Sequence, residues 1–234
     1  MKTKLFNTLA AATTLAGIVA TSGAANAASL SYTSSTNYDF TNIIDAPLSV
    51  QKFDSSLGAL KGVTISFTGD ILGNAGFENR SPTPTQVTVN LTSLLSLQLN
   101  NQSLFALNPQ DISSYQAAKY DGNTDYLGTS GKTISNLTAT QSATQSFTNT
   151  QFLQSFTGNG DIDFLFSALA NSVVTGSGNM RSYVETYAKA GIKVTYDYDA
   201  KSVPEPSATL GIGLIAGLCL LSQRKKSWIK VSNS

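Results

Sequence analysis

The sequence has few side chains that could do chemistry, and the most regular set is a short acidic stretch. Asp121, Asn123 and Asp125 alternate within DGNTD, and oxygen ligands at alternate positions are typical of calcium-binding loops. An EF-hand loop beginning at Asp121 would need glycine at its sixth position and an acid at its twelfth, where the chain has Tyr126 and Lys132. The stretch is therefore either a calcium site of another kind, completed by backbone carbonyl groups, or a loop closed by Asx turns.

Two pairs of carboxylates are the remaining candidates for acid–base chemistry. Asp161 and Asp163 form one pair, and Asp197 and Asp199 form the other. Residues two apart on a strand share a face, and two carboxyl groups about 5–10 Å apart can hydrolyse a glycosidic bond. Acids at strand ends are more often solvated residues that discourage aggregation, and we expect that role for both pairs.

The residue types that are missing narrow the chemistry further. The chain has no histidine, and its one cysteine is Cys219. Without histidine there is no Ser-His-Asp or Cys-His arrangement and no histidine-ligated zinc site, so we expect a protein that is not an enzyme. Tyr183, Tyr187, Tyr196 and Tyr198 leave two interpretations open, a platform for sugar rings or cross-strand packing in a core.

The local pattern that must position these residues is β throughout. Val63 to Thr68 (VTISFT) alternates strictly between apolar and polar residues, and related patterns recur along the chain. The other stretches are Ser29 to Ser35, Val87 to Leu91 with its continuation to Leu99, Ile134 to Thr140, Ile162 to Leu165 and Ile192 to Tyr198. Many short strands with one apolar face predict an antiparallel β-sandwich, and we expect a jelly-roll order.

Turn signals separate the expected strands, and only two short stretches favour a helix. The turn signals are Gly69-Asp70, Gly73-Asn74, Ser81-Pro82, Asp121-Gly122, Gly158-Asn159-Gly160 and Gly176-Ser177-Gly178. The helical candidates are Ser113 to Ala118 and Thr150 to Ser155. We therefore expect an all-β body with little helix.

The first 27 residues have the layout of a secretory signal peptide. Two lysines precede a mostly apolar run from Leu5 to Ala20. An A-x-A cleavage site follows at Ala25 and Ala27, which places the cut before Ala28. We expect residues 1–27 to direct export through the Sec translocon, and residues 28–202 to form the exported body.

The charge of this body excludes one class of partner. Residues 28–202 hold nine Lys and Arg against thirteen Asp and Glu, so their formal charge is −4 although the whole chain carries +1. A mildly acidic body has no electrostatic basis for binding nucleic acid. The body also lacks cysteine, so its core alone must hold it together.

Residues 203–226 have three parts in a fixed order. The parts are Val203-Pro204-Glu205-Pro206, an apolar run from Ser207 to Ser222, and the basic cluster Arg224-Lys225-Lys226. The run is short for a permanent membrane span, which usually takes about 20 apolar residues. The positive-inside rule puts the tail, residues 227–234, in the cytoplasm and the body outside.

This order of parts resembles the PEP-CTERM sorting signal of exported proteins in Gram-negative bacteria and cyanobacteria. The resemblance implies that a membrane-embedded exosortase recognises and processes the protein. It also implies that the apolar run is a short transmembrane helix that anchors the body only at first. One departure is the tail from Ser227 to Ser234, which is longer than usual for such signals.

The body resembles the choice-of-anchor E domain of exported proteins. The residues that carry the resemblance are KFDSSLGAL (Lys52 to Leu60), DGNTDYLGTSG (Asp121 to Gly131), Phe156-Thr157-Gly158 and Val194-Thr195-Tyr196. No activity is attached to that family, so the resemblance implies export and anchoring without a reaction. Within KFDSSLGAL we expect Phe53, Leu57 and Leu60 in the core, with a turn at Asp54.

Two functions from different classes remain open. The first is a non-catalytic domain at the cell surface or in the extracellular matrix, which contacts exopolysaccharide or other envelope components. The second is a carbohydrate-binding module or a weak polysaccharide hydrolase. Both place the body outside the cell.

Overall fold

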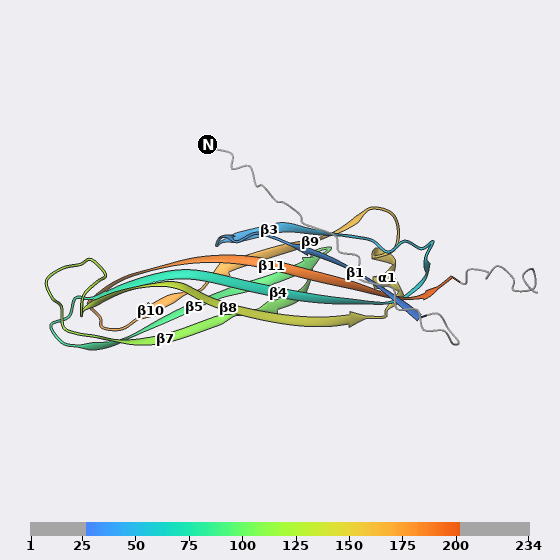
Figure 1. Ribbon diagram of the computed structural model, residues 1–234. Helices are drawn as coiled ribbons and strands as arrows, with labels where there is room; N and C mark the ends of the chain where they lie inside the picture. The colour runs from blue at the N-terminus through green and yellow to red at the C-terminus, as the bar shows by residue number, and fades with distance from the viewer. Residues whose placement is uncertain (1–26, 202–234) are drawn as a thin grey trace, which may run out of the picture. The chain divides into compact units, whose positions relative to one another are not determined.

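The computed structural model describes residues 27–201, and strands make up most of them (Figure 1). The signal peptide, the Pro-Glu-Pro triplet, the apolar run, the basic cluster and the tail lie outside the described residues, apart from Ala27 at the cleavage site. Within the described range, no helix has the length and apolar character needed to cross a membrane.

One sheet, which we call the first sheet, has five strands. They are β1 (Ala27–Ser35), β2 (Asp39–Phe40), β4 (Gly58–Asn79), β8 (Gly131–Phe147) and β11 (Met180–Ala200). Their order is β1-β11-β4-β8, β2 also pairs with β11, and every pairing is antiparallel. The central strands β4 and β11 have 22 and 21 residues, so each spans about 70 Å.

The second sheet has six strands. They are β3 (Ile43–Gln51), β5 (Thr85–Leu99), β6 (Gln102–Leu107), β7 (Gln110–Ala117), β9 (Asp161–Ala170) and β10 (Val173–Thr175). The order is β10-β5-β9-β3, and β6 and β7 also pair with β5, all antiparallel.

The helix α1 (Thr150–Ser155) joins β8 to β9, as the sequence predicted. It begins after Asn149, whose side-chain oxygen accepts hydrogen bonds from the backbone nitrogens of Gln151 and Phe152 at 2.9 and 3.3 Å. Such a cap satisfies amide groups that have no partner in the first helical turn. The cap explains why a helix starts at this point in a chain dominated by strands.

The alternating pattern of the strands builds one core between the two sheets. In β4, Phe67 is fully buried, while Ser66 and Thr68 on either side are partly exposed. The ring of Phe67 lies 6.2 Å from that of Phe166 in β9 and 5.7 Å from that of Phe105 in β6. These contacts across the sheets confirm the predicted all-β class with antiparallel sheets in a sandwich.

Two glycines that were predicted to mark turns lie inside β4 instead. A Cβ atom on Gly69 would lie 2.2 Å from Cδ1 of Leu95, and one on Gly73 would lie 2.4 Å from Cδ1 of Leu91. Both leucines belong to β5, so side chains of the second sheet occupy the space that a side chain on β4 would need. The glycines therefore mark a close approach of the two sheets rather than turns.

The predicted helix at Ser113 to Ala118 is wrong, because most of this stretch belongs to β7. β7 pairs with β5 without a break, from Gln110 opposite Thr92 to Ala117 opposite Thr85. A short segment with weak local preference takes the conformation that its long neighbour imposes. The same reason explains why the sequence showed no signal for β3 and β6.

The KFDSSLGAL stretch forms the expected turn at Asp54, but only part of its expected core positions are buried. Phe53 is fully buried, and Asp54 accepts a hydrogen bond from the backbone nitrogen of Ser56 at 2.8 Å. Leu60 is partly buried against the core. Leu57 is 41% exposed, so its predicted core position is wrong, because the turn directs it outward.

Candidate functional site

The acidic loop between β7 and β8 is closed by its own side chains. Oδ1 of Asp121 accepts a hydrogen bond from the backbone nitrogen of Asn123 at 2.9 Å, and Oδ1 of Asp125 accepts one from that of Leu127 at 3.0 Å. These hydrogen bonds are Asx turns, one of the two interpretations of the stretch. Among residues 27–201, no group of three or more His, Cys, Asp or Glu is placed to hold a metal ion.

A buried carboxylate that sequence reasoning missed holds this loop in place. Glu78 in β4 is fully buried; Ser130 Oγ donates to its Oε1 at 2.5 Å, and the backbone nitrogen of Tyr126 donates to its Oε2 at 2.9 Å. Glu78 occupies an outward position in the alternation of β4, which normally leaves an acid in water. The loop covers this position, and the sequence carries no signal for that covering.

The two acid pairs lie at exposed strand ends. Asp161 and Asp163 begin β9, and Ser49 Oγ donates to Oδ1 of Asp163 at 2.6 Å. Asp197 and Asp199 lie near the end of β11, with similar exposure. Their surroundings are those of solvated carboxylates, the role that the sequence predicted.

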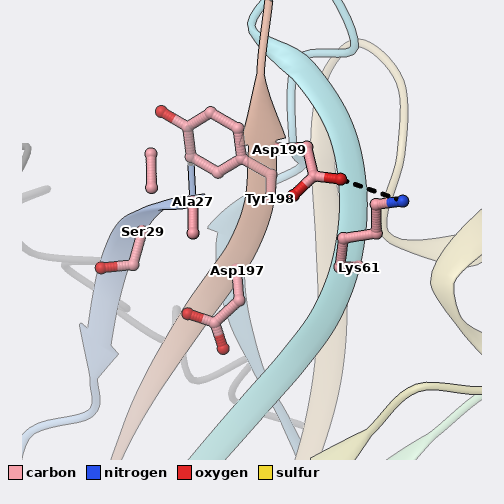
Figure 2. Close-up of a pocket in the computed structure, with 7 residues that line it drawn as sticks. Ala27, Ser29, Lys61, Asp197, Tyr198 and Asp199 are labelled. Atoms are coloured by element: carbon pink, nitrogen blue, oxygen red, sulfur yellow. Dashed lines mark ion pairs between the residues drawn. The ribbon is translucent and has the colours of Figure 1, made fainter. Parts of the chain in front are cut away.

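A shallow hollow of about 340 Å³ lies beside the second acid pair (Figure 2). Its lining residues are Ala27, Ala28, Ser29, Lys61, Asp197, Tyr198 and Asp199. Lys61 Nζ lies 3.1 Å from Oδ2 of Asp199, with both side chains about half exposed, so water screens this ion pair. Figure 2 shows Asp197 directed away from Lys61. The hollow has no cysteine or histidine for nucleophilic catalysis.

Two of the four singled-out tyrosines belong to the core. Tyr196 is fully buried and Tyr198 is 6% exposed. The Tyr196 hydroxyl donates to the backbone carbonyl of Gln51 at 2.8 Å, which ties β11 to β3 in the other sheet. Burial raises the pKa of Tyr196 well above its usual value, and neighbouring Tyr32 adds to the rise. For Tyr196 and Tyr198, the packing interpretation is therefore the correct one.

The third tyrosine, Tyr187, belongs to a small aromatic cluster on the outer face of the first sheet. Phe40 lies opposite Tyr187 across the β2–β11 pair, and their rings meet edge to face with centroids 4.6 Å apart. Tyr38 precedes β2, and Lys189 Nζ lies 5.3 Å from the centre of its ring. Tyr38 and Phe40 are 44% and 52% exposed. We call Tyr38, Phe40 and Tyr187 the aromatic cluster.

The largest regular feature of this outer face is a set of paired hydroxyl groups. Three pairs join β4 to β8 and one joins β1 to β11, with oxygen–oxygen distances of 2.8 to 2.9 Å. We call these eight residues the hydroxyl face: Thr64 with Ser146, Ser66 with Thr144, Thr68 with Ser142, and Ser31 with Thr195.

The strand register joins two of these pairs into one longer row. Thr195 lies opposite Thr64, so this row runs from Ser31 through both of them to Ser146, across four strands. Ser31 is only 8% exposed, so the accessible part of the row runs from Thr195 to Ser146. Neighbouring strands lie about 4.8 Å apart, and outward positions repeat about every 6.8 Å along a strand. In the next row Lys193 lies between Thr33 and Ser66, and in the row after it Gly191 lies opposite Thr68. The hydroxyl face is thus a regular set of hydroxyl pairs with one lysine among them. Alternation predicted outward Ser and Thr on single strands, but not the register that aligns them.

Comparisons with known proteins give little to set beside this geometry. No protein-family model matches the chain, and no curated protein matches it. Among solved structures, it is similar to a mutant VP2 protein of infectious bursal disease virus in derived T=1 particles, with 9% identity over 85% of this chain and 48% of that chain and a TM-score of 0.14. The Gx strain of the same virus gives 11% identity, 89% and 52% coverage, and a TM-score of 0.12. The chain spans about half the length of these viral chains, and scores this low carry no argument.

Proposed function

We propose that this chain is an exported protein, sorted by a PEP-CTERM-type signal and an exosortase, whose choice-of-anchor E-like β domain acts without catalysis at the cell surface or in the extracellular matrix. In this proposal Val203 to Pro206 and the basic cluster at Arg224 to Lys226 are the sorting signal. Signal peptidase cuts between Ala27 and Ala28 after passage through the Sec translocon. The partner of the domain is exopolysaccharide or another hydrated envelope polymer.

The observation that carries this function is the hydroxyl face. Hydroxyl-rich polymers form hydrogen bonds with regularly spaced donors and acceptors, and a flat face can contact many repeat units at once. The eight members include no general base that could activate a hydroxyl group as a nucleophile, so the face suits adhesion rather than bond cleavage.

The strand order supports a jelly-roll interpretation of the domain. In the first sheet β1 lies beside β11, and β4 and β8 follow; in the second sheet the order is β10-β5-β9-β3. Along the chain the longer strands pass from one sheet to the other: β3, β5 and β9 lie in the second sheet, and β4, β8 and β11 lie in the first. Jelly rolls, which occur in lectins and capsid proteins, interleave two Greek keys between two sheets. Such a fold exposes a broad sheet face to solvent. The fold alone does not identify a function, so the proposal depends on the residues of that face.

A co-sedimentation experiment tests the function. The full chain is expressed with its export signals, purified in mild detergent and mixed with the extracellular polysaccharide of the host. We expect saturable co-sedimentation with the polymer and no new reducing sugar ends after prolonged incubation. Release of reducing ends, or recovery of all the protein in the supernatant, would overturn the proposal.

The aromatic cluster favours a second candidate, a carbohydrate-binding module that stacks sugar rings. Exposed Phe40 and Tyr38 offer ring faces to a sugar, as aromatic residues at binding surfaces commonly do. The hydrolase form of this alternative has weaker support. Asp197 lies ten residues from Tyr187 along β11, about 33 Å away, whereas glycoside hydrolysis needs acids beside the bound sugar.

Substitution in the aromatic cluster separates this second candidate from the first. If sugar stacking dominates, Phe40→Ala lowers affinity for soluble oligosaccharides at least tenfold, measured by titration calorimetry on the full chain. The matched control is Ile112→Ala in β7, which removes a side chain of similar exposure, 57% against 52%. Equal affinities in the two variants would rule out a stacking platform at Phe40.

A further inference from the structure

The strand β8 forms one edge of the first sheet and pairs with only one strand in the part of the chain that the structure describes. Its partner is β4 (Figure 1). An edge strand presents a row of backbone N–H and C=O groups that can pair with another strand. The second side of β8 therefore offers such groups to an added strand.

Edge strands usually carry features that prevent such docking, and β8 carries them only in its first residues: Lys132, and an irregular register between Ile134 and Leu137 where Asn136 has a φ of 60°. From Leu137 to Phe147 there is no charged residue, no proline and no break in the register. β3, an edge of the second sheet, has both kinds of protection: Pro47 within the strand, and Asp45 in an irregular register between Ile43 and Ala46. Proline and irregular register are recognised means of blocking an edge.

We propose that β8 pairs antiparallel with β8 of a second copy of this chain, centred on Ser142. Even-numbered positions from Thr138 to Ser146 face outward with the hydroxyl face, and a two-fold axis through Ser142 sets each even position opposite another even position. The pairing thus keeps outward residues beside outward residues, as a continuous sheet requires. It is an isologous interface, the commonest arrangement in homodimers.

The side chains that meet in this register are complementary. Thr140 lies opposite Thr144, Thr138 opposite Ser146, and Ser142 opposite its own copy. Hydroxyl pairs of this kind are favourable between antiparallel strands, and they repeat across the dimer the pairs that join β4 to β8 in one copy.

The inward side of the same register sets one apolar pair and two alanine–glutamine pairs opposite one another, and no charge opposes the pairing. Gln141 faces Ala143 and Gln145 faces Ala139, and both glutamines are hydrogen-bonded within one copy to the backbone of Asn108 and Leu104. Leu137, which is 7% exposed, lies opposite Phe147, which packs against the core. Because the segment is neutral, two copies approach without like-charge repulsion. The segment is neutral and complementary to itself in this register. These two properties favour a second copy of the chain, rather than an unrelated strand, as the partner of β8.

The pairing has a consequence for the hydroxyl face. Two first sheets joined edge to edge form one continuous sheet, and the hydroxyl faces of both copies lie on the same side of it. A surface of twice the width gains affinity for a repeating polymer through multivalency. This consequence rests on the proposed function, but the dimer itself does not.

Charge substitution at the two-fold axis tests the dimer. The full chain is studied by sedimentation velocity in mild detergent over a range of concentrations. Ser142→Lys and Ser142→Glu each place two like charges opposite one another, and we expect each to raise the dimer dissociation constant at least tenfold. An equimolar mixture of the two variants pairs lysine with glutamate, so we expect it to recover the association. All variants carry the same C-terminal run, which removes that run as the cause of any difference.

Thr33→Glu is the matched control on the opposite edge of the sheet. Thr33 is exposed on β1 and lies opposite Lys193, so a glutamate there is tolerated by the fold. We expect this variant to associate as the natural chain does. A monomeric natural chain, unchanged association of the Ser142 variants, or equal weakening by Thr33→Glu would each overturn the proposal, and the last would assign the contact to β1.

Disulfide trapping tests the register independently of affinity. In a Cys219→Ser background, a mixture of Thr140→Cys and Thr144→Cys chains forms a crosslinked heterodimer, because directly opposite residues lie within disulfide range. Each variant alone crosslinks at least fivefold less, since its cysteines are then four residues apart in the register. Equal crosslinking in the mixture and in the separate variants would contradict this register.

Discussion

At the scale of single residues, the buried tyrosine hydroxyl is the group whose role the structure changes most. Alternation in IKVTYDY placed Tyr196 on one face of a strand and left sugar stacking and packing both open. The structure buries it and gives its hydroxyl one acceptor, the carbonyl of Gln51. No local sequence pattern predicts that acceptor, because Gln51 and Tyr196 are 145 residues apart in the chain. Only the packing of the two sheets brings them together.

Replacement of Tyr196 by phenylalanine tests this role. We expect Tyr196→Phe to lower the free energy of unfolding by about 1–2 kcal/mol, because the hydrogen bond from the buried Tyr196 hydroxyl to the Gln51 carbonyl is lost. Urea denaturation at pH 8 measures the change. The control is Tyr38→Phe, which alters an exposed ring and should shift stability by less than about 0.5 kcal/mol. Equal stability of the two variants would show that the hydrogen bond contributes nothing.

The same tyrosine predicts how stability depends on alkaline pH. Its pKa in the folded state is raised by burial, above the value of about 10 in an unfolded chain. The resulting stability is complete below pH 10 and is lost as pH rises beyond it, because only the unfolded chain then releases the proton freely. Tyr196→Phe should therefore lose less stability than the natural chain between pH 9 and 11 in urea titrations. A steeper loss in the variant would contradict this account.

At the scale of elements, sequence periodicity located β1, β4, β5, β8, β9 and β11 but not their lengths. VTISFT and IKVTYDY lie in β4 and β11, yet both strands extend far beyond the segments with strict alternation. The length of β4 could not be predicted, because Gly69 and Gly73 were interpreted as turn residues. Glycine is a common turn signal, and a sequence does not show that a second sheet packs against these positions. The contact with Leu91 and Leu95 that explains these glycines is a property of two packed sheets, which no single strand contains.

Two alanine substitutions in the first sheet test this explanation. A Cβ atom on Gly73 would lie 2.4 Å from Leu91 Cδ1 and 2.6 Å from the carbonyl oxygen of Glu185, and the latter is backbone that cannot move aside. We expect Gly73→Ala to destabilise the protein by about 2–3 kcal/mol. Gly191→Ala in β11 is the control, because a Cβ atom there meets nothing within 4 Å. Thermal unfolding that ranks the two variants in the opposite order would refute the close-approach role.

At the scale of the whole molecule, the register of β1 and β11 relates the two ends of the described body. Ala27 lies opposite Asp199, so the predicted signal-peptidase site lies beside the last residues of β11 at one end of the sheet. The sequence predicted both sorting segments from their composition alone. It could not place the cleavage site beside the end of β11, because that proximity depends on a pairing between residues about 170 positions apart.

Intact-mass analysis of the exported protein tests the processing that we propose. In a host with an exosortase, we expect the mature chain to begin at Ala28 and to lack Arg224 to Ser234. A strain without the exosortase provides the control and should retain the C-terminal residues. Detection of the complete C-terminus on the exported protein in the first host would contradict exosortase processing.

The central claim is that the hydroxyl face contacts the polymer, and a double substitution measures it most directly. Thr64→Val with Thr68→Val removes two hydroxyl groups from the face while it keeps the β-branched shape of the side chains. Thr88→Val is the control, because Thr88 forms a similar exposed hydroxyl pair with Ser114 on the second sheet, at 3.2 Å. In co-sedimentation of the full chain with the host polysaccharide, we predict at least a tenfold higher Kd for the double variant, about 1.4 kcal/mol, and an unchanged Kd for the control. An unchanged Kd in the double variant, or an equal loss in the control, would contradict the claim.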